Sequence, residues 1–129
     1  MLHIYLPDSA HRAADIALKN RLYVSGWQLS YILKDIRSGH QHQIGSRVAI
    51  YYKDKEPIGV AVITNYYSVQ VFVRKSERRK GIGSALVKTL SGGQRCYAQR
   101  GIHGSEQFWY KNGAIMPNKY FHYPLDTLF

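Results

Sequence analysis

The segment 71–90 constrains the fold most strongly, because its pattern changes from strand to helix across two closely spaced glycines. The run from Val71 through Phe72 to Val73 is β-branched and aromatic, which favours a strand. A basic stretch, then Gly81-Ile82-Gly83 and a helical pattern of apolar residues, follow it. Such a helix presents the unpaired amides of its first turn, and its dipole adds about half a positive charge there. The segment therefore predicts an anion site.

The charge and spacing of this segment indicate which anion it binds. Five of the seven residues 74–80 are basic, which favours a ligand with more than one phosphate. Gly81 and Gly83 allow close approach of the backbone, and positive φ where the turn requires it. The spacing differs from that of a P-loop, and Leu86 stands where a dinucleotide fingerprint has its third glycine. These two common phosphate motifs are therefore excluded.

The pattern that fits is R-x-x-G-x-G, read as Arg78-Arg79-Lys80-Gly81-Ile82-Gly83. It resembles the acyl-coenzyme A pyrophosphate loop of the GCN5-related N-acetyltransferases (GNAT), over about twenty residues of this chain. One departure is Lys75, which stands where these loops often have a proline. The resemblance implies that acetyl-CoA is a co-substrate. The alternative is a basic surface turn before an ordinary helix.

Length and composition predict one globular domain, residues 1–129. The chain has 45% hydrophobic and 20% charged residues, a globular balance. It has no apolar run of the roughly 20 residues needed to span a bilayer, and its N-terminus does not read as a secretory signal. The single Cys96 cannot form an internal disulfide and reads as an apolar filler. We therefore expect a cytoplasmic protein without membrane association.

The net charge indicates an acidic partner. The segment 74–80 carries five basic residues and one glutamate, a net +4, so +6 of the total +10 lies elsewhere. Coenzyme A accounts for the first share but not for the second. The remainder favours nucleic acid as a second partner, although a solvated surface that keeps the protein soluble explains it equally well.

The order of patterns predicts an α+β fold with a mixed, largely antiparallel sheet of six to seven strands, flanked by about four helices. This order resembles that of the GNAT family along nearly the whole chain. An edge strand left open at the C-terminal end would permit a homodimer. The expected strands are 2–6, 48–52, 58–64, 68–74, 94–99 and 119–123. Four helices are expected: one that begins near Ala10, one over 29–36, one from the glycine loop to Ser91, and one over 105–112.

The resemblance also implies roles for particular residues. In the family, backbone amides of the strand before the loop bind the pantetheine arm and thioester, and the loop binds the pyrophosphate. The acceptor wall of the family comes from the connection between the first two helices and from the last strands, which here means Arg21, Tyr23 and Trp27 with residues near 120–123. Trp109, on the last expected helix, is a core or acceptor-wall residue. The expected coenzyme-binding residues are Val71, Phe72, Val73, Arg78, Arg79, Lys80, Gly81, Ile82, Gly83 and Ser84.

The sequence indicates the general acid and the general base of the transfer less clearly. Family members often use a tyrosine in a pattern like F-Y-x-x-x-G, whereas counting back from Gly113 places Trp109 at that position and Tyr110 one residue late. Tyr110 is the candidate acid, although one helical residue is about 100° of rotation. The strand before the loop contains no carboxylate. His103, which precedes the last helix, is a candidate base, as are His40 and His42 in their loop, and Glu106 and Asp35 are further options. A water-relayed base, or an amine already neutral, explains the absence equally well.

No metal is expected, because His40 and His42 lack a nearby third ligand. The first hypothesis is an N-acetyltransferase that acts on an amine acceptor, with the residual charge favouring a macromolecule such as an aminoacyl-tRNA or a protein. The second is a catalytically inactive GNAT-fold module that binds nucleic acid or a protein. A third, a small nucleic-acid-binding domain without coenzyme, requires the glycine loop to be accidental.

Overall fold

The computed structural model describes residues 1–5, 8–39, 45–64, 68–91, 97–99 and 122–124. Its strands are β1 (Leu2–Tyr5), β2 (Arg47–Lys53), β3 (Glu56–Ile63), β4 (Ser68–Val73), β5 (Tyr97–Gln99) and β6 (His122–Pro124). Its α-helices are α1 (Ala10–Lys19), α2 (Gln28–Ser38) and α3 (Ile82–Ser91), and a 3₁₀ turn, η2 (Lys75–Glu77), lies between β4 and α3.

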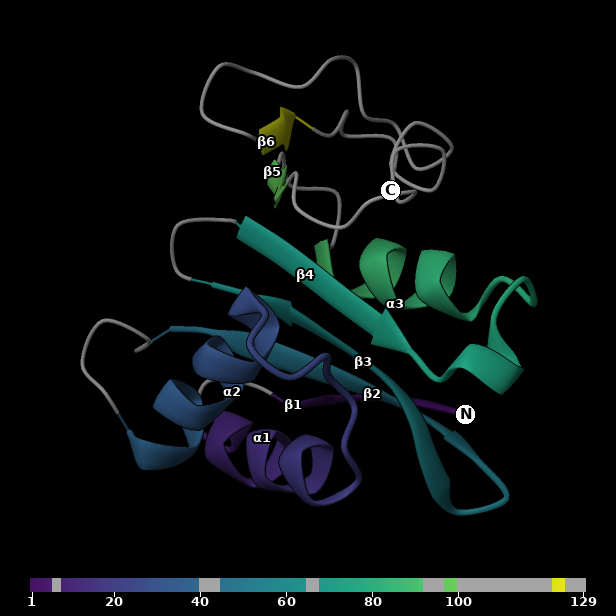
Figure 1. Ribbon diagram of the computed structural model, residues 1–129, viewed down its shortest axis with the longest axis horizontal. Coiled ribbons are helices and arrows are strands. Elements are labelled where there is room, and N and C mark those ends of the chain that lie inside the picture. The colour runs from purple at the N-terminus through teal and green to yellow at the C-terminus, as the bar shows by residue number, and fades with distance from the viewer. Residues whose placement is uncertain (6–7, 40–44, 65–67, 92–96, 100–121, 125–129) are drawn as a thin grey trace.

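The strands form one sheet in the order β1-β2-β3-β4-β5-β6. Every neighbouring pair is antiparallel except β4 and β5, which are parallel and flank α3 in the chain. Helices α1 and α2 cover one face of the sheet and α3 covers the other (Figure 1). The predicted α+β class with a mixed, largely antiparallel sheet is therefore confirmed, while the expected helix 105–112 lies outside the described residues.

Helices α1 and α2 form because their apolar residues repeat at helical spacing and can all face the sheet. The buried side chains of α1 include Ala13, Ala14 and Ala17, and their small size lets the helix pack closely. In α2 the buried leucines and isoleucines lie on one side of the helix. Gly39 ends α2 in the left-handed conformation, with φ of 73°. Helix α1 thus begins at Ala10, and α2 includes the range 29–36, as the sequence predicts.

The core lies on both sides of the central strand β3, whose residues Ile58–Ile63 are buried. Val60 and Val62 pack against α1 and α2, whereas Ala61 and Ile63 pack against α3. This alternation is the period of two that a strand imposes on its side chains. Strand β4 continues it, with Val69 toward α3 and Phe72 toward the other layer.

The β2–β3 connection is tighter than the sequence suggests. We expected strands 48–52 and 58–64, but β2 runs to Lys53 and β3 starts at Glu56. Asp54 and Lys55 form the turn with φ of 51° and 69°, values more typical of Asn-Gly pairs. Pro57 therefore belongs to the strand, next to a register shift between Tyr51 and Tyr52. The sequence points away from this turn because neither turn residue is glycine.

The remaining boundary differences are small. Strand β4 ends at Val73 rather than residue 74, because the 3₁₀ turn η2 begins directly after Arg74. Pro124 is the last residue of β6 rather than the residue that follows it. In the part of the chain that the structure describes, no helix has both the length and the apolarity required to cross a membrane.

Candidate coenzyme site

The last residues of strand β4 direct backbone groups to the side away from β3, where no described strand pairs with them. Thr64 N donates to Ser68 O (3.0 Å) and Arg74 N donates to Ile58 O (2.9 Å). In an antiparallel pair, alternate residues direct both backbone groups to the partner, so Phe72 faces β3 and Val71 and Val73 face away.

On that far side, β5 pairs with only the first two residues of β4, Ser68 and Val69. Among the described strands, none pairs with this side of β4 beyond Val69. The amides of Val71 and Val73 thus line an edge that a ligand's amides and carbonyl could extend.

The glycine loop follows the end of this edge. The first hydrogen bond of α3 runs from Ala85 N to Gly81 O (3.0 Å), so the amides of Ile82 and Gly83 have no acceptor within the helix. Gly81 has φ of 81°, and a Cβ added there would meet no atom within 4 Å. Gly81 therefore provides both the left-handed turn and open space in front of the helix. Gly83 lies inside α3 and does not adopt positive φ.

Arg78 connects the loop to the open edge of β4. Its Nε donates to Val73 O at 2.7 Å, and its guanidinium carbon lies 5.5 Å from the centroid of the Phe72 ring. The carbonyl of Val73 is one of the groups that face away from β3, so Arg78 occupies it and leaves the amide of Val73 at the edge. Predicted coenzyme residues from β4 and from the loop are thus brought together.

Glu77 offsets part of the loop's charge, as the sequence suggests. Its carboxylate accepts from Lys53 Nζ at 2.9 Å and from Lys80 Nζ at 3.0 Å. The hydrogen bond from Lys53, followed by that from Lys80, lowers the pKa of Glu77. Lys53 lies at the end of β2, so this contact joins the β2–β3 hairpin to the loop.

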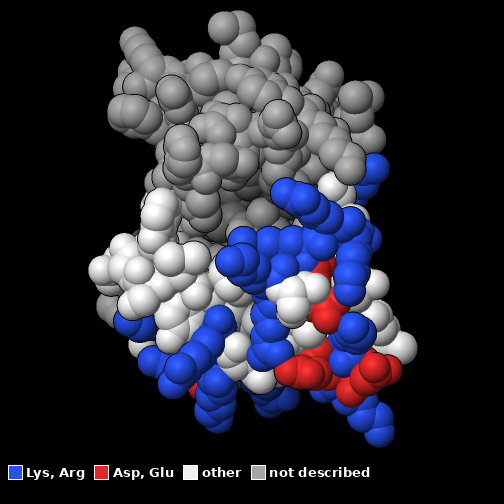
Figure 2. Space-filling view, turned by 45° about the vertical axis from the view of Figure 1, so that its right-hand side comes forward, with Lys and Arg blue, Asp and Glu red and all other residues white. Residues whose placement is uncertain are grey.

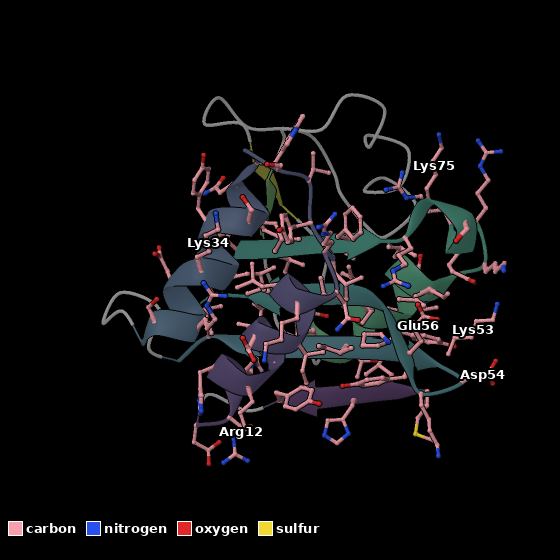
Figure 3. All side chains as sticks on the ribbon, turned by 60° about the horizontal axis from the view of Figure 1, so that its bottom comes forward. Arg12, Lys34, Lys53, Asp54, Glu56 and Lys75 are labelled. Carbon is pink, nitrogen blue, oxygen red and sulfur yellow. The ribbon has the colours of Figure 1, made fainter. Side chains whose placement is uncertain are left out.

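Arg74 makes a second connection to the same hairpin. It forms an ion pair with Glu56, and its Nη2 donates to Asn20 O at the end of α1 (3.3 Å). The hairpin residues Glu56 and Lys53, labelled in Figure 3, therefore hold the segment at Arg74, directly before η2, and at Glu77, the last residue of η2. Of the five basic residues, Arg74 and Lys80 are paired, whereas Lys75 and Arg79 are exposed and have no carboxylate partner among the described residues. Figure 2 shows Lys and Arg gathered over this face, with Asp and Glu mostly toward its lower right.

We expect substitution of Glu77 by glutamine to change the pH dependence of stability. Because pairing lowers the pKa of Glu77, its contribution is full above the unfolded value of about 4.3 and is lost as pH falls through the lower folded value. Urea unfolding midpoints of wild type and variant should differ at pH 7 and converge in acid. The control is Asp54→Asn, in the exposed hairpin turn. A difference that persists unchanged in acid would contradict this assignment.

Of the predicted acceptor and acid–base residues, those that the structure describes include Tyr23 and Trp27. Tyr23 is half-buried and packs against the same core cluster as Phe72, and Trp27 is exposed. The candidates His103, Trp109 and Tyr110 lie outside the described residues, as do His40 and His42. Within the described ranges, no three His, Cys, Asp or Glu residues are grouped so that they could hold a metal ion.

Gly59 is a site-positioning residue that sequence reasoning missed. It is buried in β3 under the start of α3, and a Cβ there would lie 3.1 Å from Leu86 Cδ1 and 3.4 Å from Ile82 Cγ2. The absence of a side chain lets the first turns of α3 rest closely on the sheet. A glycine inside a strand pattern is the signal that could have identified this close approach.

Comparison with known proteins gives this arrangement a context. The family model described as an acetyltransferase (GNAT) domain matches residues 45–115, which is more than half of the chain. No sequence among the curated proteins matches.

Solved structures share the fold at low sequence identity. A GNAT family protein from Desulfovibrio desulfuricans has a TM-score of 0.62 and 16% identity, over 98% of this chain and 99% of that one. A ribosomal-protein-alanine N-acetyltransferase from Brucella melitensis has a TM-score of 0.60 and 13% identity, over 92% and 95%. A GNAT family acetyltransferase from Brucella melitensis in complex with acetyl-CoA has a TM-score of 0.54 and 18% identity, over 98% and 88%.

Proposed function

Because the chain belongs to the GNAT acetyltransferase family, we propose that it transfers an acetyl group from acetyl-CoA to an amine acceptor. The observation that carries this proposal is that Arg78 connects two binding features, the open edge of β4 and the glycine loop. Arg78 joins the open edge of β4 to the loop before α3, so amides for an extended ligand and amides for a phosphate lie next to each other. Acetyl-CoA has both an amide-containing arm and a pyrophosphate.

In this proposal the two features bind different parts of the coenzyme. The amides at the start of α3, with residues Arg78 to Ser84, bind the pyrophosphate, and hydrogen bonds to charged groups contribute about 1.5–3 kcal/mol each. Val71 and Val73 pair their outward amides with the pantetheine arm and the thioester oxygen. Phe72 supports this edge from the opposite face of β4.

The transfer itself needs two proton movements. The acceptor nitrogen attacks the thioester carbon, a C–N bond forms, the C–S bond breaks, and the sulfur leaves as a thiolate. We assign Tyr110 as the acid that protonates the sulfur and His103 as the base that takes the proton from the amine. Strand β4 contains no carboxylate that could act as the base. An acceptor amine that is already neutral would attack without such a base.

The acceptor that we favour is an amine on a macromolecule, an aminoacyl-tRNA or a protein. The +6 of net charge outside residues 74–80 supports an acidic acceptor rather than a neutral metabolite. Tyr23, Trp27 and Trp109 form the acceptor wall in this proposal. The described residues of this wall lie on or near the layer formed by α1 and α2.

The second candidate is a catalytically inactive module that keeps the coenzyme fold and binds nucleic acid or a protein. The one-residue offset of Tyr110 and the lack of a carboxylate in β4 favour it. Release of free thiol from acetyl-CoA in the presence of amines separates the candidates, because only the enzyme produces it faster than buffer alone.

Thermal unfolding with and without acetyl-CoA tests the coenzyme site. A ligand that binds only the folded state adds about 2.7 kcal/mol at 100 times its Kd, so the midpoint should rise clearly. Thiol release is then measured with aminoacyl-tRNA, peptides and small amines. A midpoint that does not move at millimolar acetyl-CoA contradicts the acetyltransferase and leaves the nucleic-acid- or protein-binding module as the candidate.

A further inference from the structure

The solvent-facing side of α2 carries a row of aromatic and basic side chains. Trp27 is the N-cap of α2, and Tyr31 and Lys34 follow at i+4 and i+7, so the three share one side of the helix. The buried residues Leu29, Ile32, Leu33 and Ile36 lie on the opposite side. Trp27 is 39% exposed and Tyr31 is 55% exposed, although both are large aromatic residues. We call Trp27, Tyr31 and Lys34 the α2 stripe.

The backbone that carries the stripe is ordered before any ligand binds. Trp27 N donates to Val24 O at 3.1 Å, and Trp27 O accepts from Ser30 N at 3.0 Å and from Ser30 Oγ at 2.6 Å. Tyr31 lies in the first turns of the helix, and Lys34 Nζ stands 5.7 Å from the centroid of its ring. A partner that binds here therefore meets a backbone that is already ordered, which limits the entropy lost on binding.

The combination of planar apolar rings and cations fits one kind of partner. Bases of a single strand stack on aromatic side chains in a sequence-tolerant way, while phosphates pair with neighbouring cations. Lys34 lies within the stripe, Arg37 is exposed one turn further along α2, and the chain as a whole carries +10. An acidic peptide would satisfy the cations but has no regular series of planar groups for Trp27 and Tyr31. We propose that the α2 stripe binds a single-stranded RNA segment.

The position of the stripe connects it with the proposed transfer. Figures 1 and 3 both show the N-terminal end of α2 beside β4. Tyr23, just before α2, packs on the same core cluster as Phe72, and Arg78 stands over Phe72. An RNA strand that lies along the stripe and ends near Trp27 is directed toward the edge of β4. This step rests on the proposed function: the acceptor amine would be carried at the end of that strand.

Binding of a fluorescently labelled 12-nucleotide single-stranded RNA, at low salt, tests the stripe. Stacking of one base predicts that Trp27→Ala and Tyr31→Ala each weaken binding about 5- to 150-fold. Trp27→Phe and Tyr31→Phe keep a ring and should bind within a few-fold of wild type. All four changes affect exposed side chains, and equal unfolding midpoints would show that the fold is retained.

The contribution of charge is tested with a matched pair of lysines. Lys34→Met should reduce the slope of log affinity against log salt by about 0.7, the value for one phosphate contact with a single strand. Lys88→Met, at an exposed position of α3 on the other face of the sheet, should leave the slope unchanged. Equal effects of the two lysines would overturn the proposal, because they indicate attraction by net charge alone.

Three other results would overturn the proposal. They are no binding of the RNA by wild type at 100 µM protein and about 50 mM salt, alanine variants that bind as wild type does, and tighter binding of a duplex than of the single strand. If the α2 stripe binds a protein instead of RNA, the alanine variants should bind the RNA as wild type does. The acetyl-CoA midpoint shift is measured on the same variants: its absence from wild type, with RNA binding intact, contradicts the proposed function and not the stripe.

Discussion

Replacing Gly59 with valine is expected to destabilise the protein and to weaken acetyl-CoA binding at the same time. The Cβ alone would lie 3.1 Å from Leu86 Cδ1, so Leu86 must give way by a few tenths of an ångström, and the two methyl groups of valine add to this crowding. Overpacking of this kind costs about 1–3 kcal/mol. At about 4 °C per kcal/mol for a chain of this length, the midpoint should fall by about 4–12 °C. The coenzyme effect follows because Ile82 and Leu86 anchor the first turns of α3.

A graded series keeps this prediction testable if the valine variant fails to fold. Gly59→Ala adds one methyl group, so it should lower both the midpoint and the acetyl-CoA shift less than valine does. Leu86→Ala removes the closest neighbour, and the double variant Gly59→Val/Leu86→Ala should lose less stability than the sum of the two single variants. Additive losses, or a coenzyme shift that is unaffected in Gly59→Val, would show that this contact does not position α3.

The coenzyme loop was predictable because its signals are local. The strand at 71–73, the two glycines and the apolar positions of the following helix all lie within twenty residues, and each acts through backbone conformation or helical spacing. The same holds for the buried faces of α1 and α2 and for the stop at Gly39. The family inferred from this loop is confirmed by the family model that matches residues 45–115.

The contacts that hold the loop could not be predicted, because they join residues far apart in the chain. Arg74 and Glu56 are 18 residues apart, and Lys53 and Glu77 are 24 residues apart. The tight turn at Asp54 and Lys55, the shortness of η2 and the register shift beside Tyr52 together decide that these pairs meet. None of these features has a sequence signal as strong as a glycine would provide.

The charge of the loop was predictable, but its distribution was not. Sequence reasoning treats the five basic residues of 74–80 as one phosphate-binding group, whereas the structure divides them. Arg74 and Lys80 are held by Glu56 and Glu77, Arg78 binds the edge of β4, and the remaining two are exposed. Three of the five basic residues therefore shape the loop, which leaves Lys75 and Arg79 as the cations most available to a phosphate.

Replacing Gly83 with glutamate is expected to abolish acetyl-CoA binding without destabilising the free protein. The carboxylate would stand in the first turn of α3, where a phosphate is proposed to bind, so the ligand-induced rise of about 2.7 kcal/mol should fall to zero. The unliganded midpoint should stay the same or rise. A residue with higher helix propensity replaces glycine, and a negative charge near a helix N-terminus is favourable.

Two control variants separate the causes of this loss. Thr89→Glu adds the same charge at an exposed position near the other end of α3 and should keep the full acetyl-CoA shift. Gly83→Gln adds similar bulk without charge, so it should retain part of the shift if repulsion of the phosphates dominates and none of it if bulk alone closes the site. A normal shift in Gly83→Glu would place the pyrophosphate away from α3. The open edge of β4 would then have to bind the coenzyme without the helix, and Arg78, which joins that edge to the loop, would lose the role that the proposed function gives it.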